Sequence, residues 1–245
     1  MVRRLTWGRP AVYFPFGILR KRGNVFRSDH ELYIGGYPRS GNTFALKAFL
    51  SANPGTLVRS HLHIPAFIVQ SAKCNWPGMV LVRNPSDAAI SWAIYKSEPL
   101  RETLGYYIDY YSVLLSLRDT LLFVSFEEVI TDFGNVIRTF NSRWGATFVP
   151  FQHTPENVSR CVEQIEAEYL DADGKVIESR VPRPSFHRRA QKESLLRQLN
   201  RSPVLQKELR RAQELHQMLM PRNFAPGRPR HNTNTTQSIR LRPAV

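Results

Sequence analysis

The stretch from Tyr33 to Lys47 constrains the fold more than any other part of the chain. It reads YIGGYPRSGNTFALK, an apolar segment followed by a glycine-containing loop and an amphipathic segment. A loop of this kind between a strand and a helix aims backbone N–H groups and the positive end of a helix dipole at one point, which suits a phosphate or a sulfate. We therefore predict a buried strand, an anion-binding loop and a helix.

The loop nearly matches the nucleotide-binding pattern G-x-x-x-x-G-K-[ST]. Gly36 and Gly41 have the required spacing, and Thr43 supplies the hydroxyl. Asn42 stands where the pattern has its lysine, and a positive charge appears instead within the loop, at Arg39. A nucleoside triphosphatase needs that lysine and a magnesium ion to neutralise the β and γ phosphates. The substitution therefore disfavours triphosphate chemistry and favours a less highly charged group, such as a sulfuryl group.

Residues 37–44, YPRSGNTF, resemble the 5′-phosphosulfate loop of sulfotransferases that use 3′-phosphoadenosine 5′-phosphosulfate, whose cytosolic members typically read Tyr-Pro-Lys-Ser-Gly-Thr-Thr-Trp. The resemblance implies in-line transfer of a sulfuryl group from that co-substrate to a hydroxyl or amine, with no metal required. It implies that Arg39 steadies the charge that develops on the bridging oxygen, a catalytic role. The donor-binding residues that it implies in the loop are Arg39, Ser40, Gly41, Asn42, Thr43 and Phe44.

A second segment places an arginine directly after a short apolar strand. Met79 to Val82 is apolar, and Pro85 is typical of the first turn of a helix. The segment resembles the family's 3′-phosphate element, an Arg-Asn pair with a Ser further along the helix. The resemblance implies 3′-phosphate binding by Arg83 and Ser91, and arginine suits this task because its fork grips phosphate in two places. An ion pair between Arg83 and a carboxylate is the competing interpretation.

Residues 58–65, VRSHLHIP, resemble the Lys-Thr-His-Leu-Pro stretch of the cytosolic enzymes. By that match His61 is the general base that takes the proton from the acceptor, a role that suits a side chain with a pKa near working pH. His63 is the competitor, because both side chains point to the same face if the stretch is extended. The sequence leaves the two open.

Two rings and two further cations complete the implied donor site. Phe126 stands where the family usually has Tyr, and Phe44 where it has Trp, so the resemblance implies that both rings contact the adenine. Core packing is the alternative for Phe126. The family's late Arg-Lys-Gly segment, which grips the 3′-phosphate, is missing here. We expect Arg188 to replace it, with Arg189 next, against the alternative of a solvated helix face.

The net charge of +14 is concentrated at the two ends of the chain. Residues 1–28 contain no acidic residue and 180–245 are strongly basic, whereas 29–179 contain more acidic than basic residues. Because the implied donor is anionic, we expect cations from the chain ends to reach it. The two cysteines and the histidines form no metal-binding pattern. The apolar stretch 11–19 contains Pro15 and Gly17 and is too short to span a membrane, so we expect a cytoplasmic protein without a transmembrane segment; a Golgi enzyme lacking its anchor is the alternative.

From residue 32 onward, strand and helix patterns alternate, which is typical of an α/β fold with a mainly parallel sheet between two layers of helices. In such P-loop-like sheets, ligands sit beyond the carboxyl ends of the strands. Arg39, His61 and Arg83 all follow a strand, so one crevice can gather them. We expect a single domain over 1–220 and a disordered basic tail over 221–245. The expected strands are 32–37, 57–60, 79–82 and 121–126; the expected helices are 42–52, 65–72, 86–97, 101–117, 133–144, 155–169 and 186–218.

Two other functions stay open at this point. A P-loop kinase of a small metabolite would need ATP, magnesium and a carboxylate after an apolar strand, for which Glu127 is the near candidate. A non-enzymatic basic module would bind anionic polymers through the chain ends. The resemblance implies a small-molecule or glycan acceptor and no nucleic acid. The sequence does not identify the acceptor, because fold alone does not determine an acceptor pocket, and it leaves the oligomeric state open.

Overall fold

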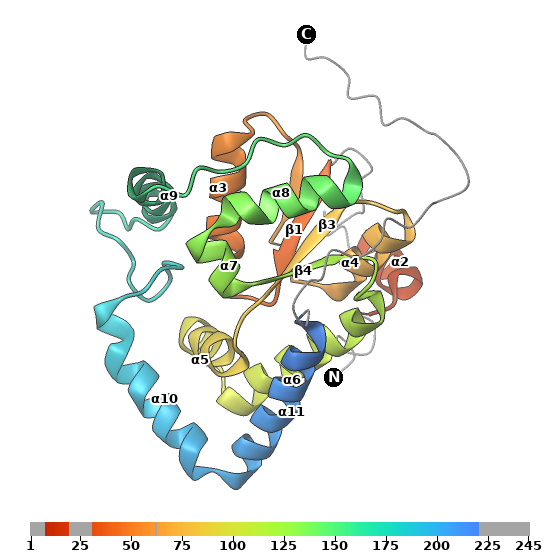
Figure 1. Ribbon diagram of the computed structural model, residues 1–245. Coiled ribbons are helices and arrows are strands. Elements are labelled where there is room, and N and C mark those ends of the chain that lie inside the picture. Colours follow the sequence, from red (N-terminus) through yellow and green to blue (C-terminus); the bar gives the residue numbers. More distant parts are fainter. Residues whose placement is uncertain (1–7, 20–30, 62, 221–245) are drawn as a thin grey trace.

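The computed structural model describes residues 8–19, 31–61 and 63–220 (Figure 1). Its centre is a parallel four-stranded sheet with the strand order β2-β1-β3-β4. Ile34 in the central strand β1 lies opposite Ser60 of β2 on one side and Met79 of β3 on the other. The strands are β1 (Leu32–Gly36), β2 (Val58–Ser60), β3 (Gly78–Val82) and β4 (Leu122–Ser125).

Helices cover both faces of this sheet (Figure 1). Successive strand residues point to opposite faces, so Val80 and Val82 enter one hydrophobic core while Met79 and Leu81 enter the other. The predicted three-layer α/β fold is confirmed. The first core is covered by α4 (Pro65–Lys73), α5 (Pro85–Lys96), α6 (Leu100–Leu114), α10 (Arg189–Arg201) and α11 (Pro203–Leu219); the second by α3 (Asn42–Ala52), α7 (Phe126–Thr131), α8 (Phe133–Trp144) and α9 (Pro155–Ala167); and α2 (Pro10–Leu19) packs on α4.

Two expected boundaries were wrong, and each has a local cause. The strand expected to reach Phe126 ends at Ser125, because a capping box between Ser125 and Glu128 starts α7 there. The single helix expected over 186–218 is two helices. Pro203 cannot donate the N–H that a continuous helix needs, and Ser202 caps the second helix by accepting from the Leu205 N–H.

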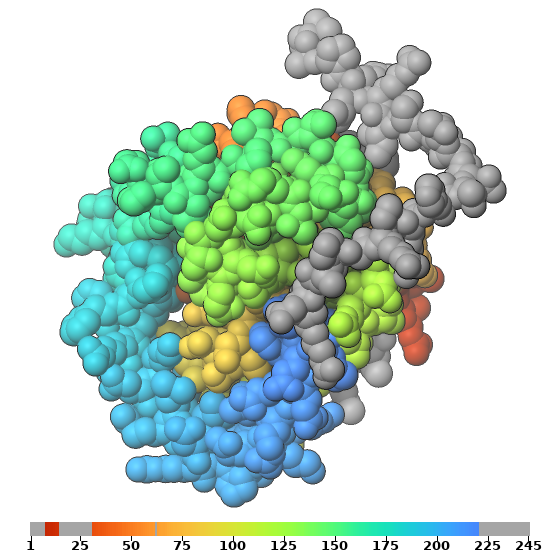
Figure 2. Space-filling model, viewed as in Figure 1, coloured from red at the N-terminus to blue at the C-terminus, as the bar shows by residue number. Residues whose placement is uncertain are grey.

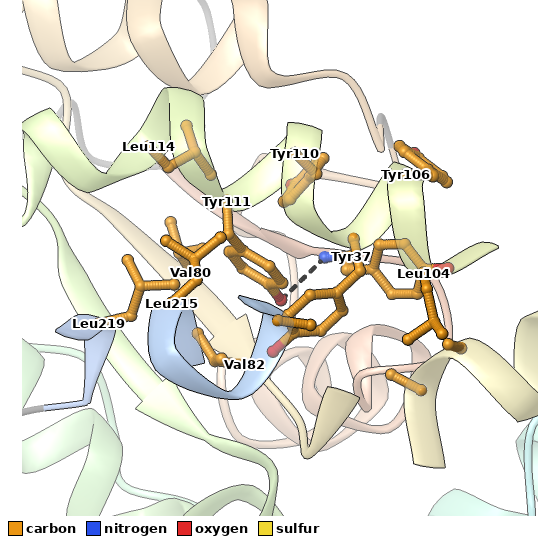
Figure 3. Close-up of a cluster of buried hydrophobic side chains, with 14 of the residues drawn as sticks. Tyr37, Val80, Val82, Leu104, Tyr106, Tyr110, Tyr111, Leu114, Leu215 and Leu219 are labelled. Carbon is orange, nitrogen blue, oxygen red and sulfur yellow. Dashed lines mark hydrogen bonds between the residues drawn. The ribbon is translucent and has the colours of Figure 1, made fainter. Parts of the chain in front are cut away.

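Helix α6 carries a cluster of buried tyrosines, which pack in the first core together with Val80 and Val82 of β3 (Figure 3). The Tyr111 hydroxyl donates to the Leu81 carbonyl at 2.6 Å and accepts from the Tyr37 N–H at 3.2 Å. The Tyr37 hydroxyl in turn donates to the Thr103 carbonyl at 3.0 Å. These bonds fix the residue that follows β1 against both β3 and α6.

The basic tail over 221–245 and most of the basic lead-in lie outside the described residues (grey in Figure 2). In the same view α5 (yellow) is visible in a recess between α7 (green) and α11 (blue). None of the helices in the described part of the chain is both long and apolar enough to cross a membrane.

Candidate anion-binding site

The loop between β1 and α3 has a backbone that few residue types can adopt. Arg39 and Gly41 have φ angles of 67° and 89°, both in the left-handed region. A Cβ atom at Gly41 would lie 3.2 Å from Cδ2 of the Phe126 ring. Glycine is therefore favoured at this position both by the φ angle and by the close approach of the ring.

Two polar side chains of the loop are turned inward. Ser40 is fully buried, and Asn42 is 4 % exposed with its Nδ2 donating to the Tyr37 carbonyl at 3.0 Å. Asn42 thus closes the loop that leads into α3. The N–H groups at the start of α3, rather than these two side chains, are the groups that suit an anion here.

Arg39 is held between α5 and the segment that follows α9. Its Nε donates to the Ser91 Oγ at 3.0 Å, and its Nη1 and Nη2 donate to the carbonyls of Arg180 and Val181 at 3.2 and 3.1 Å. Burial lowers the pKa of Arg39 to about 10, and the nearby charge of Arg188 acts in the same direction. The guanidinium therefore remains charged at neutral pH.

Arg83, at the end of β3, reaches the same loop. Its Nη1 donates to the Arg39 carbonyl at 2.9 Å, and its Cζ lies 4.2 Å from the centroid of the Phe126 ring. The Arg83 carbonyl accepts from the Tyr107 hydroxyl at 2.9 Å. Among the described residues, no carboxylate pairs with Arg83, and its buried Nε has no hydrogen-bond partner. An ion pair with a carboxylate is thus not what holds this arginine.

The structure separates the two candidate histidines. His61 has a φ of 60°, and its Nε2 lies 3.1 Å from Thr43 Oγ1 in the loop. His63 instead contacts the Gly36 carbonyl through Nδ1 at 2.9 Å, so Nδ1 carries the proton. Partial burial lowers the pKa of His61, and burial lowers that of His63 to about 4. His61 faces the loop, whereas His63 supports the end of β1.

Three side chains on the surface of α5 lie beside this site. The rings of Trp92 and Tyr95 are stacked at 5.3 Å and 21°, and Lys96 Nζ lies 5.2 and 5.3 Å from their centroids. Tyr95 lies 5.5 Å from the Arg39 Cζ, and Trp92 lies 6.5 Å from the His63 ring. We did not predict these residues, although their i, i+3, i+4 spacing after a helix start was a readable signal.

The two rings predicted to contact adenine have different surroundings. Phe126 lies between Arg83 and Gly41, within the site. Phe44 packs at 6.3 Å from Phe151, in the second core. Adenine contact by either ring stays a prediction.

Arg188 and Arg189, the two arginines expected to bind the 3′-phosphate, differ in their burial and in their contacts. Arg188 is half-buried, donates to the Arg183 carbonyl and lies near Arg39. Arg189 is 71 % exposed and pairs with Glu193 at 3.0 Å along α10. One cation from the C-terminal part of the chain therefore approaches the loop, whereas a role of Arg189 in donor binding stays a prediction without support from its contacts.

In the part of the chain that the structure describes, no group of three or more His, Cys, Asp and Glu side chains is placed to hold a metal ion. Glu127, the carboxylate considered for a kinase, is exposed at the start of α7. Whether the reaction needs a metal stays a prediction.

No protein-family profile matches this chain, and no curated protein matches it. Among solved structures, it is similar to the crystal structure of mouse sulfotransferase SULT7A1 complexed with PAP. The two chains are 13% identical, the match covers 74% of this chain and 89% of that chain, and the TM-score is 0.40. The assignment of the fold therefore rests on the sheet order and the two helical layers, and the function on the site itself.

Proposed function

We propose that this protein is a sulfotransferase that moves a sulfuryl group from 3′-phosphoadenosine 5′-phosphosulfate to a hydroxyl or amine. The observation that carries the proposal is the meeting of Arg39 and Arg83 at the carboxyl edge of the sheet, with 2.9 Å between Arg83 Nη1 and the Arg39 carbonyl. Neither guanidinium has a carboxylate partner among the described residues. Two such cations beside a helix N-terminus suit a nucleotide that carries phosphates at two positions.

The two phosphates of the donor would occupy different parts of the site. The N–H groups from Gly41 to Thr43 and the guanidinium of Arg39 would hold the 5′-phosphosulfate, since the Ser40 N–H already donates to the Tyr37 carbonyl at 3.3 Å. Arg83, whose buried Nε is free of other partners in the described region, would hold the 3′-phosphate. The Ser91 hydroxyl already accepts from Arg39 Nε, so Ser91 could bind either the 5′-phosphosulfate or the 3′-phosphate.

The transfer is a displacement at sulfur. The acceptor oxygen or nitrogen forms a bond to sulfur while the bond from sulfur to the 5′-phosphate oxygen breaks, and adenosine 3′,5′-bisphosphate leaves. The proton of the acceptor passes to the His61 imidazole, which is neutral at pH 7 because its pKa lies below the usual 6.5. Arg39 stabilises the charge on the departing oxygen as a fixed cation.

Thermal unfolding with two nucleotides tests this proposal. Adenosine 3′,5′-bisphosphate at about 100 times its Kd should stabilise the protein by roughly 2.7 kcal/mol. Stabilisation by ATP with magnesium but not by the bisphosphate would favour a metabolite kinase. Binding of anionic polymers with no response to either nucleotide would favour a non-enzymatic basic module.

A further inference from the structure

His61 and Thr43 share one hydrogen bond that can run in either direction. His61 Nε2 lies 3.1 Å from Thr43 Oγ1, and either atom can be the donor. The hydroxyl has one hydrogen to give, and a neutral imidazole carries one proton on one of its two ring nitrogens. Each direction of the bond therefore belongs to a different tautomer of His61.

The two directions give His61 different chemistry. If Thr43 donates, its hydrogen occupies the lone pair of Nε2 and the ring proton is on Nδ1, so the ring has no free lone pair. If Nε2–H donates to the Thr43 oxygen instead, the lone pair of Nδ1 is free. Only the second arrangement can accept a proton without first breaking the contact with Thr43.

The other neighbours of His61 do not make this choice. The tautomer of a histidine is commonly set by a carboxylate or a carbonyl that bonds to its second ring nitrogen. Among the described residues, no such group bonds to Nδ1 of His61, and none besides His61 bonds to the Thr43 hydroxyl. Glu168, the nearby carboxylate that raises the pKa of His61, is itself paired with Lys47. Within the described protein, the tautomer thus depends on Thr43.

The position of Thr43 links this choice to the proposed donor. Thr43 is the second residue of α3, and the residue before that helix, Gly41, has no side chain to cap the N–H groups of the first turn. A 5′-phosphate bound at these N–H groups would lie beside the Thr43 hydroxyl, and its oxygens only accept hydrogen bonds. Hydrogen bonds to an ionised acceptor are about twice as strong as neutral ones, so the hydroxyl would donate to the phosphate rather than to the imidazole.

We propose that Thr43 selects the tautomer of His61, and that occupation of the donor site makes the selection. This inference rests on the proposed sulfotransferase function. With the single hydrogen of Thr43 on the 5′-phosphate, the bond to His61 must come from Nε2–H, and Nδ1 becomes the atom that receives the proton of the acceptor. Thr43 is thus a positioning residue that prepares the base only when the donor is bound.

The transfer then proceeds with the bond between His61 and Thr43 intact. The acceptor oxygen or nitrogen forms its bond to sulfur, the bond from sulfur to the 5′-phosphate oxygen breaks, and the acceptor proton moves to Nδ1. The imidazolium still donates through Nε2 to Thr43, whose hydroxyl still donates to the departing phosphate. Two consecutive hydrogen bonds thus connect the new positive charge on the ring with the negative charge on the leaving group.

Nitrogen-15 NMR of the protein with labelled histidine tests this inference at a pH well above 6.5, where His61 is neutral. Couplings between ring hydrogens and ring nitrogens identify the protonated nitrogen, and His61→Ala assigns the signal. Saturating adenosine 3′,5′-bisphosphate should raise the ratio of the Nε2–H to the Nδ1–H tautomer of His61 about tenfold. Saturating adenosine 3′-monophosphate, which lacks the 5′-phosphate, should leave the ratio unchanged.

Two substitutions at Thr43 separate the selection of a tautomer from a change in the fold. In Thr43→Val, saturating bisphosphate should no longer change the ratio, because valine has no hydroxyl. Thr43→Ser keeps the hydroxyl and should restore the response. The matched control is Thr139→Val on α8, which removes a hydroxyl that donates to the Asn135 carbonyl at 3.0 Å and should respond like the wild type.

An unchanged ratio in the wild-type protein with bound bisphosphate would overturn the inference, and so would an equal response to adenosine 3′-monophosphate or an equal response of Thr43→Val. If Thr43→Val does not fold, the wild-type protein with the two nucleotides still decides the question. If the bisphosphate gives no stabilisation against thermal unfolding, the proposed function fails first. If it stabilises the protein while the tautomer of His61 stays the same, only the present inference fails.

Discussion

The guanidinium of Arg83 donates to the main-chain carbonyl of Arg39 across 2.9 Å. The two residues follow β3 and β1, which are neighbours in the sheet although a helix, a strand and another helix separate them along the chain. Because parallel strands end at the same edge, their following residues meet there. Under the proposed function, this proximity would let one nucleotide contact the loop and both guanidinium groups.

Replacing Arg83 by Met should weaken binding of adenosine 3′,5′-bisphosphate. A hydrogen bond to a charged group contributes about 1.5–3 kcal/mol, so Kd should rise by roughly 10- to 150-fold. Isothermal titration calorimetry measures this change. Arg138→Met removes an exposed arginine that pairs with Asp132 at 3.4 Å, and it is the matched control. Similar affinities of the two variants would contradict the assignment.

Under the proposed function, replacing His61 by Ala should lower kcat by roughly 10² to 10⁴, because the proposed general base is lost. Stabilisation by adenosine 3′,5′-bisphosphate should persist, since the donor contacts are intact. His63→Ala should instead lower the free energy of unfolding, because the bond to the Gly36 carbonyl is lost. Steady-state kinetics and urea unfolding distinguish the two; loss of turnover in a stable His63 variant alone would transfer the role of base to His63.

The free energy of unfolding should fall between pH 7 and pH 5, with His63 contributing roughly 2 kcal/mol. The pKa of His63 is about 4 in the folded protein against 6.5 for an unperturbed histidine, so the unfolded chain binds more protons in this range and acid favours it. Urea unfolding at several pH values measures the slope. His63→Gln keeps an amide donor for Gly36 but does not titrate, so its slope should be smaller. An unchanged slope would show that His63 does not contribute.

Gly41 and Gly55 provide a matched pair of substitutions. Both have left-handed φ angles, 89° and 83°, but a Cβ at Gly41 would lie 3.2 Å from the Phe126 ring, whereas one at Gly55 would meet nothing within 4 Å. Gly55→Ala should therefore show strain alone, about 1–2 kcal/mol. Gly41→Ala should destabilise more and weaken nucleotide binding at least about tenfold. Equal effects in urea unfolding and calorimetry would argue against a tightly packed loop.

Tyr111→Phe should lower the free energy of unfolding by about 2–3 kcal/mol. The change leaves the buried Tyr37 N–H and Leu81 carbonyl without this hydroxyl, and unsatisfied buried groups are costly. Tyr107→Phe removes one bond, to the partly buried Arg83 carbonyl, and should cost about 1 kcal/mol. Urea unfolding of both variants checks the order; a larger loss for Tyr107→Phe would contradict the role given to Tyr111.

The strand, loop and helix around Gly41 were predictable because their signals are local. The position of Arg83 followed from one general rule about parallel sheets. The helix start at Phe126 was missed although Ser125 and Glu128 have the spacing of a capping box, and the break before Pro203 was also readable.

Other features had no readable signal in the sequence. The partners of the Arg39 guanidinium include two main-chain carbonyls more than 140 positions further along the chain, and every residue has a carbonyl. The left-handed backbone at His61 likewise has no signal in the residue type, because histidine does not require a positive φ. Site residues that lie on one loop could therefore be predicted from the sequence. Contacts between segments far apart in the sequence could not.

The tyrosines of α6 connect the beginning of the domain to its end. Leu215 and Leu219 of α11 share the core of Tyr111, whose hydroxyl holds the residue after β1 (Figure 3). The last helix in the described chain, α11, thus supports the loop after β1 through Tyr111. Truncating the polypeptide ahead of Leu215 would therefore loosen the loop after β1 without removing any residue of the candidate site.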